Sequence, residues 1–147
     1  MKGYEKEQGL IPLSVLEIFS AIKKDKRFNT HNFNISVSYL EIYNENVNDL
    51  IDPSNKNLDV RESISNGIYI NKLTETQVDS FEEVMAIMEK GDEFRNIAST
   101  KLNELSSRSH TVFRINLKQH TSDSTLKISQ LNLVDLAGSE GASKTQA

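Results

Sequence analysis

The segment Leu131–Glu140, with the sequence LNLVDLAGSE, decides how the rest of the chain is interpreted. Its apolar first half predicts a buried strand, which leads directly to Asp135 and then to Gly138. A carboxylate at the carboxyl end of a strand lies where ligands bind in open α/β sheets, and it can hold Mg²⁺ directly or through water. A glycine three residues later lets a backbone N–H approach a phosphate oxygen without a Cβ in the way. The apolar residues of the predicted strand are Leu131, Leu133 and Val134.

This short pattern has a second interpretation, because any strand that ends in an acidic turn with a glycine would look the same. A polar segment upstream, Asn103–His110, bears on the choice. It reads NELSSRSH and places three hydroxyls, a guanidinium and an imidazole directly before Thr111–Leu117, whose alternating pattern predicts a strand. A solvated loop would be equally polar, so composition alone does not separate a binding segment from a loop.

The strings NELSSRSH and LNLVDLAGSE closely resemble the two nucleotide-sensing segments of kinesin motor domains, switch I and switch II. Other stretches fall where kinesins carry similar strings, so the resemblance covers nearly the whole chain. It implies an α/β fold that is part of the kinesin-type P-loop NTPase fold, a mixed and mostly antiparallel β-sheet flanked by helices. The matching stretches are Gly9–Pro12 (GLIP), Val37–Asn44 (VSYLEIYN), Val47–Ile51 (VNDLI), Ser80–Met88 (SFEEVMAIM) and Ser143–Thr145 (SKT).

The resemblance also implies a site for ATP and Mg²⁺ in the intact motor domain. Ser107 would ligate Mg²⁺ or contact the γ-phosphate, Ser106 would hold the attacking water, and Asn103 would contact the phosphate region. Asp135 would bind Mg²⁺ through water, and the backbone amide of Gly138 would sense the γ-phosphate. Phosphoryl transfer depends on positioning and charge stabilisation more than on covalent help, which suits these residue types.

By the same resemblance, Arg108 and Glu140 would form an ion pair that latches the two switches shut and supports catalysis. A guanidinium–carboxylate pair is bidentate and geometrically specific, so it forms only when both loops close. Taken alone, Arg108 is typical of a solubilising surface residue. His110 taken alone is typical of a structural residue that orients its loop, and we do not expect it to be catalytic.

Kinesins bind microtubules, so tubulin is the implied partner, and the implied location is the cytoplasmic cytoskeleton. The contact would use a hairpin lobe at about Leu58–Leu73, in which Arg61 and Lys72 could meet an acidic tubulin surface. A lone exposed Arg or Lys is also typical of a merely solvated residue. The Phe113-Arg114 pair and the run Lys127–Leu131 weakly resemble centromere-associated kinesins, which would place the protein at the spindle or kinetochore.

The sequence departs from the kinesin pattern in several places. It contains no GxxxxGK[ST] phosphate-binding loop, and Gly141 and Gln146 stand where kinesins usually carry a basic residue and a glycine. We therefore expect residues 1–147 to be the middle portion of a motor domain, without the tubulin-docking helix, the neck or the stalk through which the parent would dimerise. Two interpretations stay open: a segment of an ATP-driven motor that is inactive by itself, or a non-enzymatic remnant that at most binds microtubules or another partner.

The composition fits one globular domain, with 147 residues of which 37% are hydrophobic and 26% are charged. The net charge of −4 gives no general basic character, so we do not expect nucleic acid to be a partner. The absence of cysteine excludes disulfides, thiolate metal sites and cysteine nucleophiles. No apolar run approaches the roughly 18 residues of a membrane span, so no membrane partner is expected.

Hydrophobic periodicity predicts the first elements. Apolar residues at helical spacing follow Pro12, and residues 33–39 alternate as in a half-exposed strand. Asn44 is predicted to cap a short helix over Val47–Ile51, which Pro53 ends. A turn-rich loop, a short hairpin and a further strand follow. The helix face comprises Val15, Ile18, Phe19 and Ile22, the hairpin comprises 58–61 and 67–70, and the strand covers 74–78.

The second half is predicted to contain a helix and a long hairpin. Ser80 and Glu83 form a capping box, and Gly91 is predicted to end the helix, with a further helical segment over residues 92–100. Residues 111–119 and 126–135 are then expected to pair as an antiparallel hairpin. Because antiparallel strands begin and end at the same place, the segments before the first strand and after the second should share one end of the sheet.

Overall fold

The alternating apolar segments pair into one five-stranded sheet, and every pair in it is antiparallel. The computed structural model describes residues 3–4, 7–24, 32–102 and 108–138. The strand order is β4-β3-β8-β9. Strands β4 and β7 both pair with the outer edge of β3, β4 along residues 40–43 and β7 along residues 35–37. The strands are β3 (Asn32–Tyr43), β4 (Asn46–Asp49), β7 (Thr76–Val78), β8 (Ser109–His120) and β9 (Leu126–Asp135).

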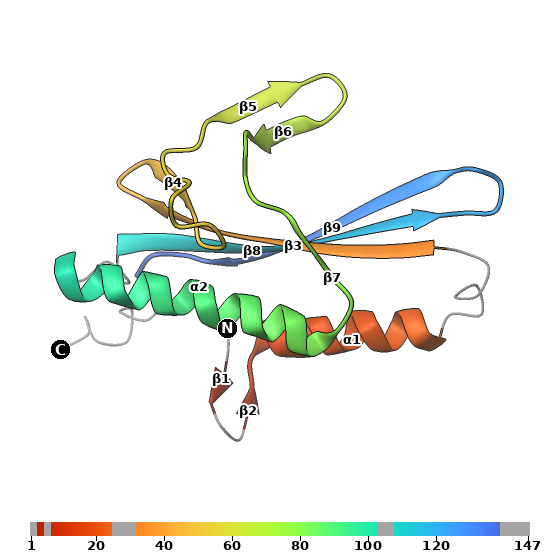
Figure 1. The fold of residues 1–147 in the computed structure, drawn as a ribbon, viewed down its shortest axis with the longest axis horizontal. Coiled ribbons are helices and arrows are strands. Elements are labelled where there is room, and N and C mark those ends of the chain that lie inside the picture. Colours follow the sequence, from red (N-terminus) through yellow and green to blue (C-terminus); the bar gives the residue numbers. More distant parts are fainter. Residues whose placement is uncertain (1–2, 5–6, 25–31, 103–107, 139–147) are drawn as a thin grey trace.

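Two helices, α1 (Leu10–Lys24) and α2 (Phe81–Leu102), lie on one face of this sheet (Figure 1). A small hairpin of β5 (Val60–Ser63) and β6 (Gly67–Ile70) stands on the opposite side, and β1 (Gly3–Tyr4) pairs with β2 (Glu7–Gln8). The hairpin and the strand predicted over residues 58–78 are thus confirmed. Within the described ranges, no helix is both long enough and apolar enough to cross a membrane.

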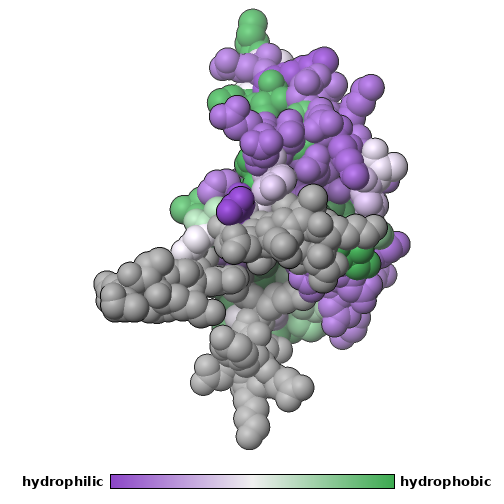
Figure 2. Space-filling model, turned by 90° about the vertical axis from the view of Figure 1, so that its left-hand side faces the viewer, coloured by the Kyte–Doolittle hydropathy of each residue, from purple (hydrophilic) through white to green (hydrophobic). Residues whose placement is uncertain are grey.

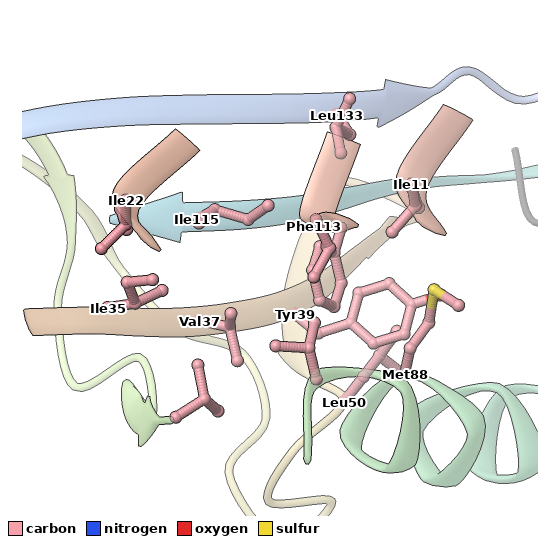
Figure 3. Close-up of a cluster of buried hydrophobic side chains, with 13 residues drawn as sticks. Ile11, Ile22, Ile35, Val37, Tyr39, Leu50, Met88, Phe113, Ile115 and Leu133 are labelled. Carbon is pink, nitrogen blue, oxygen red and sulfur yellow. The ribbon is translucent and has the colours of Figure 1, made fainter. Parts of the chain in front are cut away.

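The hydrophobic core fills the space between the sheet and the two helices (Figure 3). The central strands β3 and β8 contribute alternate residues to it, because side chains of a strand alternate between faces. The predicted apolar face of α1 is confirmed, with Val15 at 1% and Ile22 at 8% exposure. The other core residues are Ile11, Ile35, Val37, Tyr39, Leu50, Val78, Val84, Met88, Phe113, Ile115 and Leu133.

Strand β9 is less buried than predicted. Leu133 is 6% exposed, but Leu131 is 39% and Val134 is 43% exposed. In the part of the chain that the structure describes, β9 pairs only with β8 and forms an edge of the sheet. The apolar run therefore predicts the strand correctly, but not its burial, because burial also requires a neighbour on the outer side.

The short helix predicted after Asn44 is wrong, and the chain forms a β-hairpin there instead. Asn44 and Glu45 have φ values of 50° and 63°, and their neighbours Tyr43 and Asn46 are paired across β3 and β4. A two-residue loop with both φ values positive matches the twist of two antiparallel strands, and Asn adopts this conformation readily. The turn chemistry of Asn44 therefore outweighs its capacity to cap a helix.

Asp49, the last residue of β4, organises the loop that follows and is only 2% exposed. Its Oδ1 accepts hydrogen bonds from the backbone amides of Ile51 and Asp52, at 2.9 and 3.1 Å. Its Oδ2 accepts from the amide of Thr74 at 2.8 Å and from Asn55 Nδ2 at 3.2 Å. One buried carboxylate thus joins the β4 loop to the chain that returns from the β5–β6 hairpin.

Helix α2 begins where the capping box predicts, because Ser80 Oγ accepts a hydrogen bond from the Glu83 amide at 3.2 Å. The predicted end at Gly91 is wrong, since the helix continues through this residue to Leu102. A Cβ at Gly91 would lie 2.5 Å from Cδ1 and 2.7 Å from Cε1 of Tyr39. The glycine is therefore a close-packing position inside one helix and not a helix end.

We predict that Gly91→Ala lowers the free energy of unfolding by about 1–3 kcal/mol, because the new methyl group overpacks the Tyr39 ring. Urea denaturation of the two proteins measures this change. Lys90→Ala, at the exposed neighbouring position, is the control and should stay within about 0.5 kcal/mol of the parent. Stabilisation by Gly91→Ala, as expected at an exposed helix position, would contradict the packing role.

Candidate functional site

The β8–β9 hairpin brings the two kinesin-like segments to one end of the sheet. Thr111 near the start of β8 is paired with Asp135 at the end of β9, and the register runs without interruption to His120 and Leu126. Arg108 directly precedes β8, and Gly138 lies three residues beyond β9. The predicted juxtaposition is confirmed for those parts of the two segments that the structure describes.

A direct hydrogen bond joins the two segments. His110 Nδ1 accepts from the backbone N–H of Ala137 at 2.8 Å. The imidazole is half-buried, and it ties the turn after β9 to the first residues of β8. This contact gives His110 a structural role in the turn after β9, whereas the loop that it was predicted to orient lies largely outside the described residues.

Arg95 of α2 holds the start of β8 from the helix side. Its Nη2 donates to Ser109 Oγ at 2.9 Å, and its Nε donates to the same oxygen at 3.3 Å. Nη2 also lies 3.4 Å from the Ser109 carbonyl oxygen. Ser109 is 1% exposed, so the Arg95 guanidinium binds a buried hydroxyl. This hydroxyl belongs to the residue that directly follows Arg108. The sequence gives no signal for this contact, because its partners lie on different elements.

Asp135 extends the core face of β9 toward the end of the sheet. It is half-buried and belongs to a cross-strand row with Thr111 of β8 and Glu41 of β3. Glu41 is 8% exposed, and its Oε2 is buried without a hydrogen-bond partner among the described residues. Adjacent strands are about 4.8 Å apart, so the backbones of Glu41 and Asp135 are about 10 Å apart, with both side chains on one face.

The phenol of Tyr39 lies behind this row. Its hydroxyl donates to Asp92 Oδ1 of α2 at 2.5 Å. Burial raises the pKa of Tyr39 well above its ordinary value, and the negative charge of Asp92 and the hydrogen bond to it raise the pKa further, with a smaller contribution from Asp135. Arg95 acts in the opposite direction. The phenol therefore stays protonated and remains a donor throughout the neutral range.

Gly138 adopts a backbone conformation that favours glycine, with φ of +79°. A Cβ at this position would meet nothing within 4 Å. Space around the residue is therefore open, and the constraint is the left-handed backbone. A glycine in open space three residues after a strand-end carboxylate suits the binding of a phosphate and a cation.

Four predicted site residues, Asn103, Ser106, Ser107 and Glu140, lie outside the described residues, and so do the departures at Gly141 and Gln146. In the described ranges, no three His, Cys, Asp or Glu side chains gather as a metal site. The donors present at the hairpin end still fit Mg²⁺, because this ion is commonly held by one or two carboxylates together with water and substrate phosphates.

The two residues predicted to contact microtubules belong to another part of the chain. Arg61 lies on β5 of the β5–β6 hairpin, and Lys72 lies two residues after β6. Arg61 Nη2 is 3.4 Å from Asp59 Oδ2, and the two side chains are 54% and 69% exposed. Lys72 is exposed and has a positive φ of 63°. In Figure 2, hydrophilic side chains predominate at the top of the molecule, where this hairpin lies, with a few hydrophobic side chains between them.

We predict that His110→Ala speeds hydrogen exchange of the Ala137 amide by about tenfold, because the acceptor for that N–H is lost. His110→Asn is the matched control, since its side-chain oxygen can replace Nδ1 as an acceptor, and it should retain most of the protection. Exchange can be followed by mass spectrometry on a peptide that contains Ala137. Equal protection in the parent and in His110→Ala would show that the bond does not hold the turn.

Comparisons with known proteins agree with this geometry. The family model for the kinesin motor domain matches residues 1–147. Kinesin-related protein 5 of Dictyostelium discoideum is 47% identical over 140 residues, which cover 95% of this chain and 14% of the relative. Kinesin-like protein KIN-7O of Arabidopsis thaliana is 42% identical over 156 residues, covering 100% of this chain and 12% of the relative.

A solved structure of a fast kinesin superposes on the chain with a TM-score of 0.84 and 41% identity. The match covers 95% of this chain and 39% of the solved one. This chain therefore spans well under half of the proteins that it matches. On the family match, the sequence identity and the shared fold, the chain belongs to the kinesin motor domain family.

Proposed function

We propose that this chain is the switch-carrying part of an ATP-driven microtubule motor, in which ATP hydrolysis is coupled to movement along microtubules. The observation that supports this proposal most strongly is the β8–β9 hairpin. It holds the residues that end the switch I-like string and those that begin the switch II-like string at one end of the sheet. A shared pocket needs this arrangement, because both segments must reach the same phosphate group.

In the proposed mechanism the chain's own residues position groups around the γ-phosphate. Ser106 orients the attacking water, while Ser107 and Asp135 hold the cation side of the site and Asn103 contacts the phosphates. Bound Mg²⁺ supplies charge neutralisation of the phosphate oxygens. The backbone N–H of Gly138 donates to a phosphate oxygen, and no Cβ at this residue obstructs the approach. Such preorganised donors act where charge develops during phosphoryl transfer.

Closure of the site is proposed to depend on an ion pair between Arg108 and Glu140. Arg108 is exposed and directly precedes the buried Ser109, which Arg95 holds in place. The backbone of Arg108 is thus anchored on its C-terminal side. A conformational change in the preceding segment can therefore move the Arg108 guanidinium while β8 stays in place. Pairing with the carboxylate would then report that both segments have closed.

A second candidate function is that of a non-enzymatic remnant that binds microtubules or another partner. The 147 residues themselves contain no GxxxxGK[ST], the loop that cradles the nucleotide phosphates, so the motor requires this loop from a part of the protein outside them. Steady-state ATPase assays of the full-length protein, with and without microtubules, distinguish the two. Microtubule-stimulated turnover supports the motor, whereas binding without turnover supports the remnant.

We predict that Glu140→Ala in the full-length protein preserves ATP binding but slows hydrolysis by about 10- to 100-fold, because a charge-assisted pair is lost on closure. Arg108→Ala should have the same effect, and the double variant should be no slower than either single one. Lys118→Ala, an exposed cation toward the other end of β8, is the control. Unchanged hydrolysis in Glu140→Ala would remove the latch from the mechanism.

We propose that the β5–β6 hairpin contributes to microtubule binding, and that the protein acts on the cytoplasmic cytoskeleton as a dimer.

Arg61→Glu and Lys72→Glu should each weaken co-sedimentation with microtubules several-fold. The effect should be larger at low ionic strength, because salt screens the interactions of exposed charges. Lys127→Glu, an exposed lysine on β9, provides the charge-matched control. If reversal at the two hairpin positions has no more effect than this control, the hairpin charges do not contact tubulin.

A further inference from the structure

Tyr39 connects three elements of the fold at one point. It lies on β3, and its hydroxyl donates a 2.5 Å hydrogen bond to Asp92 of α2, a residue 53 positions away in the sequence. Its ring packs edge-to-face against Phe113 of β8, with ring centroids 5.2 Å apart and an interplanar angle of 68°. Figure 3 shows Tyr39 in the core beside Phe113 and Met88. The side chain therefore fixes α2 relative to both strands.

Gly91 allows this close approach. A Cβ there would lie 2.5 Å from the Tyr39 ring, so the helix and the ring are in contact directly beside Asp92. The ring contact and the hydroxyl contact involve adjacent helix residues. Together they restrict both the distance between α2 and the sheet and the rotation of α2 about its axis.

The restricted part of the helix carries Arg95. Residues three apart lie on one face of a helix, so Asp92 and Arg95 face the sheet together. Arg95 donates to the 1% exposed hydroxyl of Ser109, the first residue of β8, at 2.9 Å. A rotation of α2 that displaced Asp92 would displace Arg95 as well, and the hold on Ser109 would weaken.

We propose that Tyr39 is a positioning residue for the nucleotide site: its hydrogen bond to Asp92 sets α2 so that Arg95 holds Ser109, and thereby orients Arg108. The effect of Tyr39 on the nucleotide site rests on the proposed function. The effect of Tyr39 on the contact between Arg95 and Ser109 does not, because that contact is a property of the fold. If the start of β8 is held less tightly, the nucleotide-competent arrangement is less populated, and the apparent affinity for nucleotide falls by the same factor.

The test uses Tyr39→Phe in the full-length protein, which removes the hydroxyl and keeps the ring. Hydrogen exchange without nucleotide should become about tenfold faster in a peptide covering residues 108–112, while peptides from the centre of β3 stay protected. Two controls remove comparable groups elsewhere: Ser36→Ala, which loses the hydrogen bond from Ser36 to Glu75, and Asp123→Asn, in the loop between β8 and β9. Both should exchange like the parent in the 108–112 peptide.

Substitutions of Asp92 supply the matched comparison. Asp92→Ala should speed the exchange at least as much as Tyr39→Phe, and adding Tyr39→Phe to it should have no further effect, because the bond from Tyr39 is already lost. Asp92→Asn keeps an acceptor oxygen and should restore exchange to within about threefold of the parent. Equal losses in the Asn and Ala variants would overturn the assignment to the Tyr39 hydrogen bond, and so would parental exchange in Tyr39→Phe.

Steady-state kinetics separate positioning from simple stability. Tyr39→Phe should raise KM for ATP several-fold, by the factor by which the competent arrangement becomes less populated, and leave kcat within about twofold. Faster exchange with unchanged KM and kcat would overturn the positioning role and leave a structural contact. A parent protein without microtubule-stimulated turnover would overturn the proposed function instead, while the exchange comparison would still decide whether Tyr39 holds the start of β8.

Discussion

The ladder of hydrogen bonds between β8 and β9 is the constraint on which the rest of the site depends. It pairs Thr111 with Asp135 and continues to His120 and Leu126, over the full length of β9. Antiparallel pairing alone would bring the two ends together, but it would not fix the residues beyond them. The bond from the Ala137 amide to His110 Nδ1 extends the connection past the last strand pair, into the turn that contains Gly138. The residues at this end of the sheet are thus positioned mainly by backbone pairing, and the turn after β9 is held in addition by the His110 imidazole.

Helix α2 supports the same end of the sheet from the core side. It is long, its middle is pressed against the Tyr39 ring, and Arg95 reaches the buried Ser109 from its second half. Buried polar contacts of this kind have low tolerance for displacement, because an unsatisfied donor or acceptor away from water is costly. The helix therefore transmits the packing of the core to the residues that begin β8. Family membership accounts for the strings in the sequence, and these contacts account for how the described residues are held.

Much of the fold could be predicted from local patterns. The apolar face of α1, the capping box at Ser80 and the two hairpins are correct, because each depends on residues close in sequence. The errors occur where a distant partner decides. Gly91 looks like a helix end, but it makes room for a tyrosine on β3. Leu131 and Val134 predict a buried strand, but burial needs a neighbour that the described chain does not supply. At Asn44, two local rules compete, and the turn conformation prevails.

The candidate site divides in the same way. The strings around Arg108 and Asp135 identify it, and antiparallel pairing predicts their proximity. The supporting residues Arg95, Asp92 and Glu41 are ordinary polar residues until the fold places them behind the hairpin. The most direct measurement is a structure of the intact motor domain with Mg²⁺ and a non-hydrolysable ATP analogue. We predict that the Ser107 hydroxyl and the Asp135 carboxylate flank one Mg²⁺ ion at the open end of the hairpin. Nucleotide bound elsewhere, with these two groups on opposite sides of the sheet, would contradict it.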